Sequence, residues 1–540
     1  MSSTFRLQHV HEPLLEFGGD GRHPDVRFGL VDHGPVDFST NETRTVRVGL
    51  IGSSETVDGF REWFARCESE IPAKPSRQPN LFPSFPGSGV TGPFRCWFEI
   101  DRHHQRILRA ASLAKVTGEE RDDVAIRLAV ELFVEEIRDL SESDRPPQVV
   151  VCALPVELIE RVKNLRGPED GEVGPRGEEG EGEAGNDAED TRLYEDFRGA
   201  LKAATLAYRI PIQIVWPSTY DERAVIKRKL AKLSARRVQD EATRAWNLFC
   251  ALYYKAGGTP WRMVRERDEF SATFLGISFF EDLGRTSLRT SSAQLFDERG
   301  EGLILKGGRA LRDKNDRHPY LSEEDAYALT KNSLGTYKRE WGTFPARLVV
   351  HKSSPFHPEE AAGFEAAIDD LGIDQADLIW LPRRSPVRLM RDGDYPPLRG
   401  MAMRLDRDTS LLYTRGSVDF FATYPGLYVP NPLMLKAHRR DRTEWDMLLK
   451  ETLALTKMNW NNTQFDGGCP SRCVPPGKSG RSSSTSARAR SPIPGIGSTC
   501  DRTRGPNIGP AARKCLGLVP GIPRVDAFLH RRPGSKVDLR

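Results

Sequence analysis

Residues 46–64, VRVGLIGSSETVDGFREWF, contain the pattern that decides the fold of the first half of the chain. The β-branched and aliphatic run over 46–51 predicts a buried strand, the glycine after it predicts a turn, and the two serines that follow are suited to cap a helix. In that helix Phe60, Trp63 and Phe64 share one face. The stretch therefore predicts a strand followed by an amphipathic helix.

The alternation of helix and strand continues along the chain. Helical periodicity followed by an apolar strand occurs twice more, at 122–140 with 148–155 and at 193–209 with 210–216. Strands that are apolar throughout and alternate with helices are typical of a parallel sheet covered by helices on both faces. We therefore expect an open α/β domain over residues 46–262. Residues 1–45 read as an extended segment too short to form a domain.

The pattern of predicted strands and helices changes after residue 262. An apolar strand and a hairpin pattern come first, followed by helices that alternate with strands, which is typical of a mixed, RNase H-like sheet. We expect this second α/β domain to span residues 263–466. Its predicted strands are 271–280, 293–307 (a hairpin), 344–354, 376–382 and 410–424, and its predicted helices are 322–341, 358–372 and 443–458.

The composition excludes several classes of protein. With 540 residues and 38% hydrophobic residues, the chain has material for two or three buried cores. It lacks an apolar run of about 18 residues and an apolar leader, so we expect neither a membrane protein nor a secreted one, and place it in the cytoplasm. The eight cysteines are scattered without zinc-ligand spacing, so free thiols are expected.

Charge is distributed unevenly. Residues 166–192 hold ten carboxylates and almost nothing apolar, which predicts a disordered acidic loop. Residues 467–540 carry fourteen Lys or Arg and three Asp or Glu, so this low-complexity tail is net +11 and the rest of the chain net −8. Any affinity of the body for nucleic acid must therefore come from a local basic groove.

The stretch 221–263 holds the candidate binding residues. It predicts two helices, the first strongly basic. Arg223 and Lys227 lie one turn apart on the first, Gln239 opens the second and Lys255 closes it. If the helices fold together, three cations and an amide converge, a set of donors suited to a terminal phosphate. From spacing alone, solvated faces of two amphipathic helices explain the same residues.

The order of short segments over residues 10–466 resembles the short prokaryotic Argonautes of MID-PIWI type. The segments that carry the resemblance are EPLLEFG (12–18), GPVDF (34–38), VGLIGSSETVDGF (48–60), NLFPSFPG (80–87), VVVCALP (149–155), RAWNLFCALYYKAGGTPW (244–261), LGISFF (275–280), VVHKSS (349–354) and LTKMNWNNTQFDG (455–467). The resemblance implies a Rossmann-like MID domain followed by an RNase H-like PIWI domain. It also implies that Arg223, Lys227, Gln239 and Lys255 bind the 5′ phosphate of a guide, with help from Mg²⁺.

The resemblance further implies that the chain does not cut its target. Active members hold paired metals with carboxylates at strand ends. The first two of those positions here are Ser278 and Ser353, which cannot bind Mg²⁺ as carboxylates do. The alternative, that Glu281 or Asp282 supplies the metal from nearby, requires ligands displaced from the end of the strand.

What remains of such a site is a channel that grips the phosphate backbone of a guide–target duplex. The candidates are Lys352, Arg383, Arg384, Arg415, Lys436, Arg439 and Arg440, for each of which ordinary surface charge is the alternative. Aromatic residues such as Trp246, Tyr254 or Trp261 suit base stacking, although their spacing favours core packing.

Inactive short Argonautes pair with an APAZ-domain protein fused to an effector, commonly a sirtuin-like or TIR module that consumes NAD. The resemblance thus implies a short guide RNA, less readily a guide DNA, a complementary single-stranded DNA target, and antiviral defence by abortive infection. One rival is a guided nuclease that is catalytically active. A second is a nucleotide-binding α/β enzyme built on VGLIGSSE, but Gly49 and Gly52 lack the third glycine of the dinucleotide fingerprint.

The family pattern stops after residue 466. Short Argonautes continue with a closing strand and helix, whereas the Arg-, Ser-, Pro- and Gly-rich tail follows here. This departure has two interpretations: an out-of-frame reading that replaced the native C-terminus, or a basic arm that binds nucleic acid.

Overall fold

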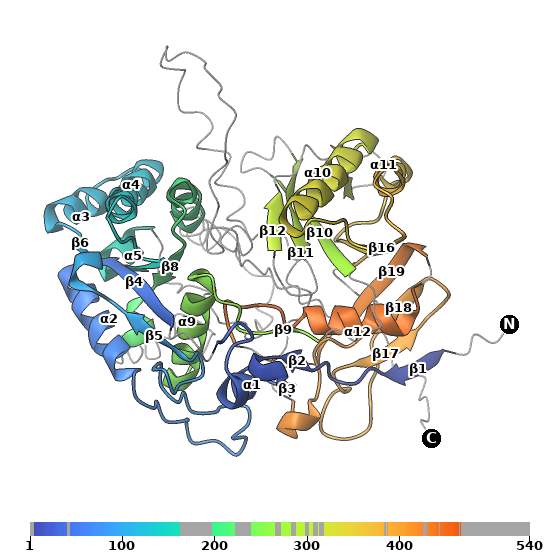
Figure 1. Cartoon of the computed structure of the whole chain (residues 1–540), viewed down its shortest axis with the longest axis horizontal. Helices are drawn as coiled ribbons and strands as arrows, with labels where there is room; N and C mark the ends of the chain where they lie inside the picture. Colours follow the sequence, from blue (N-terminus) through green and yellow to red (C-terminus); the bar gives the residue numbers. More distant parts are fainter. Residues whose placement is uncertain are drawn as a thin grey trace, which may run out of the picture.

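A computed structural model describes residues 5–39, 44–162, 197–221, 239–264, 272–281, 288–296, 302–305, 311–312, 318–382, 385, 387–424, 429–441, 443–463 and 465. These residues form two α/β lobes with the first part of the chain between them (Figure 1). Arg223, Lys227, Asp282, Arg383 and Arg384 lie outside the described residues, as do the whole of the acidic loop at 166–192 and the whole of the tail at 467–540.

The first lobe contains the predicted parallel sheet. Its strands are β4 (Arg44–Gly52), β5 (Cys96–Glu99), β6 (Gln105–Ile107), β7 (Val149–Ala153) and β8 (Ile212–Val215). They run in the order β5-β4-β7-β8, with β6 also beside β4, and every pairing is parallel. The helices are α2 (Ser54–Arg66), α3 (Ala110–Thr117), α4 (Asp122–Ser141), α5 (Val156–Val162), α7 (Pro217–Tyr220) and α9 (Glu241–Lys255), with a further helix at 197–205.

Helices cover both faces of this sheet, as the sequence predicted. One buried cluster joins the sheet to α2 and α9, and another joins it to α3, α4 and α5. Hydrogen bonds to neighbouring groups of the same lobe hold the turn between β4 and α2. The Ser53 hydroxyl accepts the Thr56 N–H at 3.3 Å, and the Thr56 hydroxyl donates to the Ala153 carbonyl at 3.1 Å. A Cβ on Gly52 would lie 2.7 Å from that carbonyl oxygen, so only glycine fits there.

The second lobe is built on a nine-stranded mixed sheet, which confirms the predicted RNase H-like α/β class. The strand order is β1-β17-β18-β19-β16-β15-β10-β11-β12. Among neighbouring strands of this sheet, only the pairs β10–β15 and β15–β16 are parallel. The strands are β1 (Arg6–His9), β10 (Ala272–Glu281), β11 (Leu288–Phe296), β12 (Gly302–Leu305), β15 (Arg347–Lys352), β16 (Gln375–Trp380), β17 (Met401–Arg404), β18 (Thr409–Leu412) and β19 (Leu433–Arg440).

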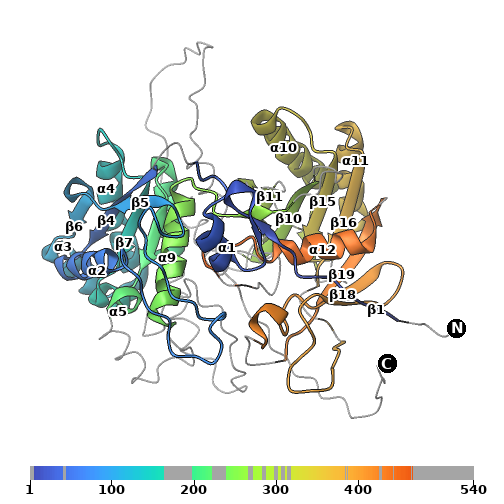
Figure 2. The same ribbon diagram turned by 60° about the horizontal axis from the view of Figure 1, so that its bottom comes forward.

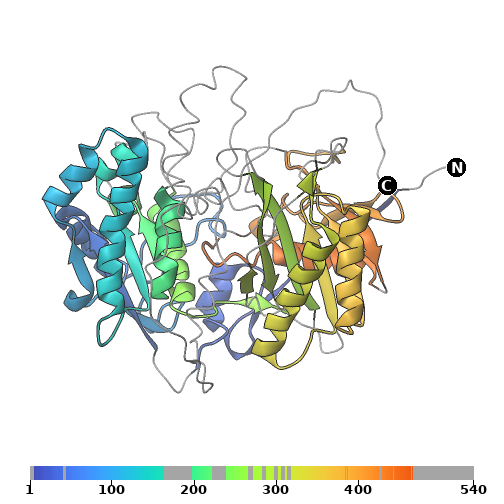
Figure 3. The ribbon, with the colours of Figure 1, turned by 90° about the horizontal axis from the view of Figure 1, so that it is seen from above.

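Helices again lie on both sides of the second sheet. α10 (Glu323–Trp341) and α11 (Pro358–Asp370) lie side by side on one face, as seen from above in Figure 3. α12 (Trp445–Leu455) joins the large cluster that also contains α2 and α9. Arg347 ties α12 to the sheet, because its guanidinium pairs with Asp377 at 2.9 Å and with Glu451 at 2.6 Å. The remaining pieces are a small pair, β13 (Leu311–Arg312) with β14 (Pro319–Tyr320), and the 3₁₀ turn η4 (Asp419–Phe421).

The N-terminal segment departs from the extended form expected for it. β1 adds an edge strand to the second sheet by pairing with β17, while β2 (Leu15–Glu16) lies between β3 (Arg22–His23) and β9 (Arg262–Met263). Figure 2 shows this segment, with helix α1 (Val26–His33), between the two lobes. The helix begins at Asp25, whose carboxylate accepts the N–H groups of Arg27 at 2.8 Å and Phe28 at 3.3 Å. The sequence analysis missed helix α1 because Gly29 interrupts its helical pattern.

Two strands of the nine-stranded sheet, β17 and β19, were also missed, as was the small pair of β13 with β14. β19 begins apolar and ends in HRR, so its sequence reads as a charged loop, yet both of its edges are paired, with β16 and with β18. None of the helices within the described ranges is both long and apolar enough to cross a bilayer.

Candidate nucleic-acid interface

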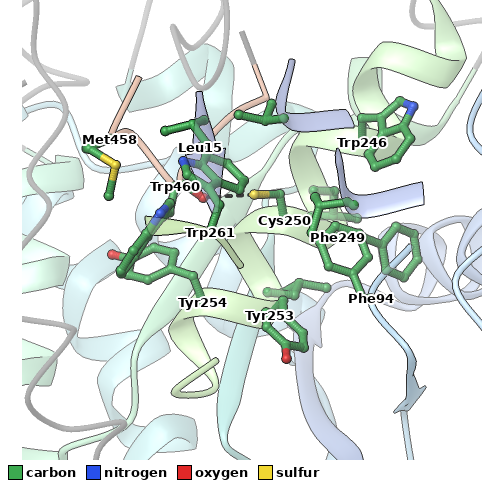
Figure 4. Close-up of a cluster of buried hydrophobic side chains, with 14 of the residues drawn as sticks. Leu15, Phe94, Trp246, Phe249, Cys250, Tyr253, Tyr254, Trp261, Met458 and Trp460 are labelled. Carbon is green, nitrogen blue, oxygen red and sulfur yellow. Dashed lines mark hydrogen bonds between the residues drawn. The ribbon is translucent and has the colours of Figure 1, made fainter. Parts of the chain in front are cut away.

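Helix α9 lies where the two lobes meet, and most of its surface is buried. Figure 4 shows Trp246, Phe249, Tyr253 and Tyr254 of this helix packed with Trp261 and with Trp460 of the second lobe. Trp246, Tyr254 and Trp261 are each at most 2% exposed. The Trp246 indole donates to the Ser84 carbonyl at 2.9 Å, and the Trp261 indole donates to the Lys457 carbonyl at 3.1 Å. The favoured reading of these aromatic residues, core packing, is therefore confirmed over base stacking.

Gln239 lies at the N-terminal end of α9, directly before the capping residue Asp240. The Asp240 carboxylate accepts the Thr243 N–H at 3.1 Å, which starts the helix. The Gln239 side-chain oxygen accepts a hydrogen bond from the Asn247 amide at 2.9 Å. Its backbone carbonyl accepts one from the Arg244 guanidinium at 2.6 Å. Both the main chain and the side chain of Gln239 are thus anchored to α9.

Lys255 is the last residue of α9, and it is buried. Its ammonium donates to the Ile212 carbonyl at 3.0 Å and to the side-chain oxygen of Gln213, both on β8. The positive charge of Lys255 acts on the neighbouring thiol of Cys152. Burial raises the pKa of Cys152 to about 12, and Lys255 acts in the opposite direction by favouring the thiolate.

The described residues form two separately anchored parts of the predicted phosphate pocket. Asn247, which holds Gln239, lies two helical turns before Lys255, or about 12 Å of helix rise. No hydrogen bond within the described ranges joins the amide of Gln239 directly to the ammonium of Lys255. Arg223 and Lys227 lie outside those ranges, so the four-residue constellation remains a prediction.

Sequence reasoning missed the residues that hold these groups, Asn247 and Gln213. One signal was available for Asn247, because an asparagine in the middle of the apolar run AWNLFCALYY is unusual for a buried helix face. Gln213 alternates with Ile212 and Ile214 on a short strand and gave no comparable signal.

The two positions expected to have lost their carboxylates lie next to each other. Ser278 is on β10, and Ser353 directly follows β15. Because β10 and β15 are parallel with Ile277 opposite Lys352, the next residue of each strand falls at the same level. The Ser353 N–H donates to the Ile277 carbonyl at 3.2 Å. Within the part of the chain that the structure describes, no three His, Cys, Asp or Glu side chains group together as metal ligands would.

A metal ion therefore does not fit the residues present at these positions. Ser278 and Ser353 offer hydroxyl groups in place of the carboxylates that Mg²⁺ prefers. The oxygens described near Gln239 are also committed, because Gln239 accepts from Asn247 and the Asp240 carboxylate accepts the N–H and hydroxyl of Thr243.

The prediction that Lys352 binds the phosphate backbone of a duplex is wrong, because its side chain is buried. The side chain is 0% exposed, and its ammonium lies 2.6 Å from the Glu360 carboxylate and 2.7 Å from the Pro355 carbonyl. Glu360 also accepts the Leu321 N–H at 3.0 Å. Burial raises the pKa of Glu360, and the charge of Lys352 offsets part of that rise. Lys352 therefore fastens α11 to β15 and does not present charge to solvent.

The other basic candidates differ in whether their charged groups already contact other groups of the chain. The Lys436 ammonium lies 4.9 Å from the centre of the Trp380 ring. Arg439 pairs with Asp441 at 2.9 Å, which raises the pKa of Arg439. Arg440 donates to the Thr443 carbonyl at 2.6 Å. Arg415 is partly exposed, and no hydrogen bond or ion pair joins its guanidinium to the described part of the chain, so it is the least engaged of the described candidates.

A buried charge network joins the N-terminal segment to the second lobe. The Glu12 carboxylate accepts a hydrogen bond from Arg399 at 2.8 Å, and its other oxygen forms an ion pair with the Lys457 ammonium at 2.6 Å. Burial raises the pKa of Glu12, but the two cations outweigh it, so the pKa lies below its ordinary value. Burial lowers the pKa of Lys457 to about 8, and Glu12 opposes that shift. This network holds residues 12–24 against the segment that follows α12, since Lys457 also donates to the carbonyls of Pro13 and Pro24.

Comparison with known proteins was informative at the level of structure. No family model and no curated protein matches the chain. Among solved structures, it is similar to Clostridium butyricum Argonaute bound to a guide DNA and a 19-mer target DNA, with a TM-score of 0.52 and 15% identity over 86% of this chain and 51% of that one.

Two further solved structures resemble the chain. Drosophila Piwi has a TM-score of 0.50 and 12% identity over 86% of this chain and 52% of that one. Aa-Ago with externally bound siRNA has a TM-score of 0.50 and 14% identity over 91% and 55%. The chain thus spans about half the length of the structures it matches. The predicted architecture is confirmed: the chain has the fold of Argonaute and Piwi proteins, with a MID-like α/β lobe followed by an RNase H-like PIWI lobe.

Proposed function

We propose that this chain binds a short guide nucleic acid by its phosphorylated 5′ end and pairs it with a complementary strand. The observation that carries the proposal is the position of the buried Lys255 ammonium at the end of α9, where two oxygens of β8 are among its hydrogen-bond partners, in a lobe of MID fold. A cation fixed in this way favours an anion, because burial strengthens electrostatic attraction and little side-chain entropy is lost on binding. Gln239, anchored on the same helix, adds an amide donor.

The proposal names an RNA guide and a single-stranded DNA target, as the resemblance to short prokaryotic Argonautes implies. A Mg²⁺ ion belongs to it only as an ion held chiefly by the phosphate itself. The deciding experiment is to extract the nucleic acid that copurifies with the chain and determine its length, sugar and 5′ group. A short population with 5′ phosphates supports the proposal, and the absence of any enriched nucleic acid rejects it.

We infer that the guided complex does not cut its target. The support is the pair of neighbouring serines, Ser278 and Ser353, where active relatives need carboxylates that hold metals. The rival reading, a guided nuclease, is tested by incubating guide-loaded protein with end-labelled target and Mn²⁺ or Mg²⁺. Cleavage that depends on the guide would reject the inactive reading.

The proposal extends to a partner. By the same resemblance, target recognition would activate an APAZ-domain protein with a sirtuin-like or TIR effector, which would deplete NAD in the cytoplasm as prokaryotic antiviral immunity. The test is to copurify such a partner with the tagged chain and to follow NAD while guide and target are added in turn. NAD loss that requires both supports this step, and loss independent of target contradicts it.

A further inference from the structure

Asn247 is a polar exception on a helix face that is otherwise apolar. It is 8% exposed and lies between Trp246 and Leu248, which are both in the large buried cluster. A buried amide costs free energy unless all its groups are hydrogen-bonded. Asn247 satisfies this requirement through two partners from distant parts of the chain, Gln239 before α9 and Thr463 after α12.

These hydrogen bonds have a direction that the chemistry of the groups dictates. The Thr463 backbone N–H is a donor only, so the group of Asn247 that faces it, at 2.9 Å, must be the side-chain oxygen. The same oxygen accepts the Thr463 hydroxyl at 3.1 Å. The side-chain NH₂ of Asn247 therefore faces Gln239, at 2.9 Å, and Gln239 must present its oxygen to it. The NH₂ of Gln239 is consequently turned away from Asn247.

We propose that Asn247 and Thr463 fix the amide of Gln239 so that the pocket presents N–H donors to the terminal phosphate. This inference rests on the proposed function. An ionised phosphate only accepts hydrogen bonds, so a reversed Gln239 amide would set one acceptor against another. Asn247 is thus a positioning residue that acts through Gln239. Because Thr463 belongs to the segment after α12, the second lobe sets the polarity of a binding group in the first.

The test is a double-mutant cycle in the full chain with two short oligonucleotides of one sequence, one with a 5′ phosphate and one with a 5′ hydroxyl, made as RNA and as DNA. Asn247→Leu removes the relay, by which we mean the hydrogen bonds that join Thr463 to Gln239 through Asn247, at nearly constant side-chain volume. We expect it to lower the ratio of affinities, phosphate over hydroxyl, about tenfold, with unchanged binding of the hydroxyl form. In a Gln239→Leu background the same change should leave the ratio as it is.

Two further variants control for folding. Thr463→Val keeps the backbone N–H and loses only the hydroxyl, so the ratio should stay within about twofold of the wild type. If Asn247→Leu does not fold, Asn247→Asp replaces it: its carboxylate still accepts from Thr463 but cannot donate to Gln239, and the phosphate preference should fall.

The outcomes separate the two ideas. Additive effects at 239 and 247, or an equal loss for both oligonucleotides, overturn the relay while leaving the guide-end site intact. A wild-type chain that does not distinguish phosphate from hydroxyl overturns the proposed function and the relay together.

Discussion

Two buried lysines, one in each lobe, differ in the partners that the described residues give them. Lys255 in the MID-like lobe donates, among the described residues, to a backbone carbonyl and to an amide oxygen, which are both neutral groups. Lys352 in the PIWI lobe lies 2.6 Å from the Glu360 carboxylate, which cancels its charge locally. Both occur in segments that the sequence marks as functional. The contrast teaches that a lysine in a binding motif can be bound to a carboxylate of its own lobe, as Lys352 is, and so hold the fold together instead of a ligand.

The largest effect should come from breaking the neutralised pair. Lys352→Met leaves the Glu360 carboxylate buried and uncompensated, so we expect the free energy of unfolding to fall by about 3–5 kcal/mol. Chemical denaturation followed by tryptophan fluorescence measures it. The double variant Lys352→Met with Glu360→Leu should recover most of the loss, because no charge then remains buried. A single variant as stable as the wild type would show that the pair is not buried in solution.

The second effect concerns Lys255, where binding rather than stability should respond. Lys255→Met should weaken binding of a 5′-phosphorylated oligonucleotide about 30-fold, or about 2 kcal/mol, because a charge-assisted hydrogen bond is lost. Binding of the 5′-hydroxyl form should change little. The matched control is Lys115→Met, which removes an exposed charge from α3 of the same lobe. If both variants weaken binding equally, Lys255 contributes only its charge and makes no specific contact with the phosphate.

A third buried lysine, Lys457, sharpens the comparison through pH. Its pKa is about 8 in the folded chain against 10.5 in the unfolded chain, so between these values the unfolded chain binds more protons. The contribution of this group to stability therefore rises with pH through that window, by up to about 1.4 kcal/mol per unit. Denaturation at pH 8, 9 and 10 should show this slope in the wild type relative to Lys457→Met. Parallel curves for the two proteins would contradict the shift.

The smallest effect is expected at an exposed cation. Arg439 pairs with Asp441 on the surface, and such pairs are screened by solvent and salt. Arg439→Gln should change target binding by no more than about twofold at physiological salt. Arg415→Gln, which removes a buried donor without a hydrogen bond to the described residues, should weaken it more. Filter binding of labelled target to the guide-loaded protein distinguishes the two, and the reverse order would reject Arg415 as a contact.

Much of the fold follows from local patterns. The apolar strands of the first sheet and the amphipathic helices α2, α4, α10 and α11 are each predicted by residue periodicity, because one period repeats over enough residues to exclude the other. The adjacency of Ser278 and Ser353 does not follow from a local pattern, because it depends on the parallel pairing of β10 with β15. β19 and α1 were missed, because their apolar pattern is interrupted by HRR in one and by Gly29 in the other.

The binding residues were less accessible to prediction. The sequence placed Gln239 and Lys255 on one helix and treated Lys352 as a surface cation. Whether each side chain reaches solvent depends on what packs over it, and that information is not contained in its own segment. Glu360, only eight residues from Lys352, gave no sign of pairing, because the turn between β15 and α11 decides where its carboxylate points.

The sequence by itself determined two α/β lobes, their order and the helix that carries the candidate pocket, and it led us to propose that two catalytic carboxylates are replaced by serines. Only the tertiary structure decided which charges are neutralised and which way an amide points. Asn247 meets Thr463 across 216 residues of chain, and Lys457 meets Pro13 across 444. The reason is physical: the state of a buried polar group is set by the atoms within about 3 Å of it, and folding brings those atoms from parts of the sequence that no local pattern connects.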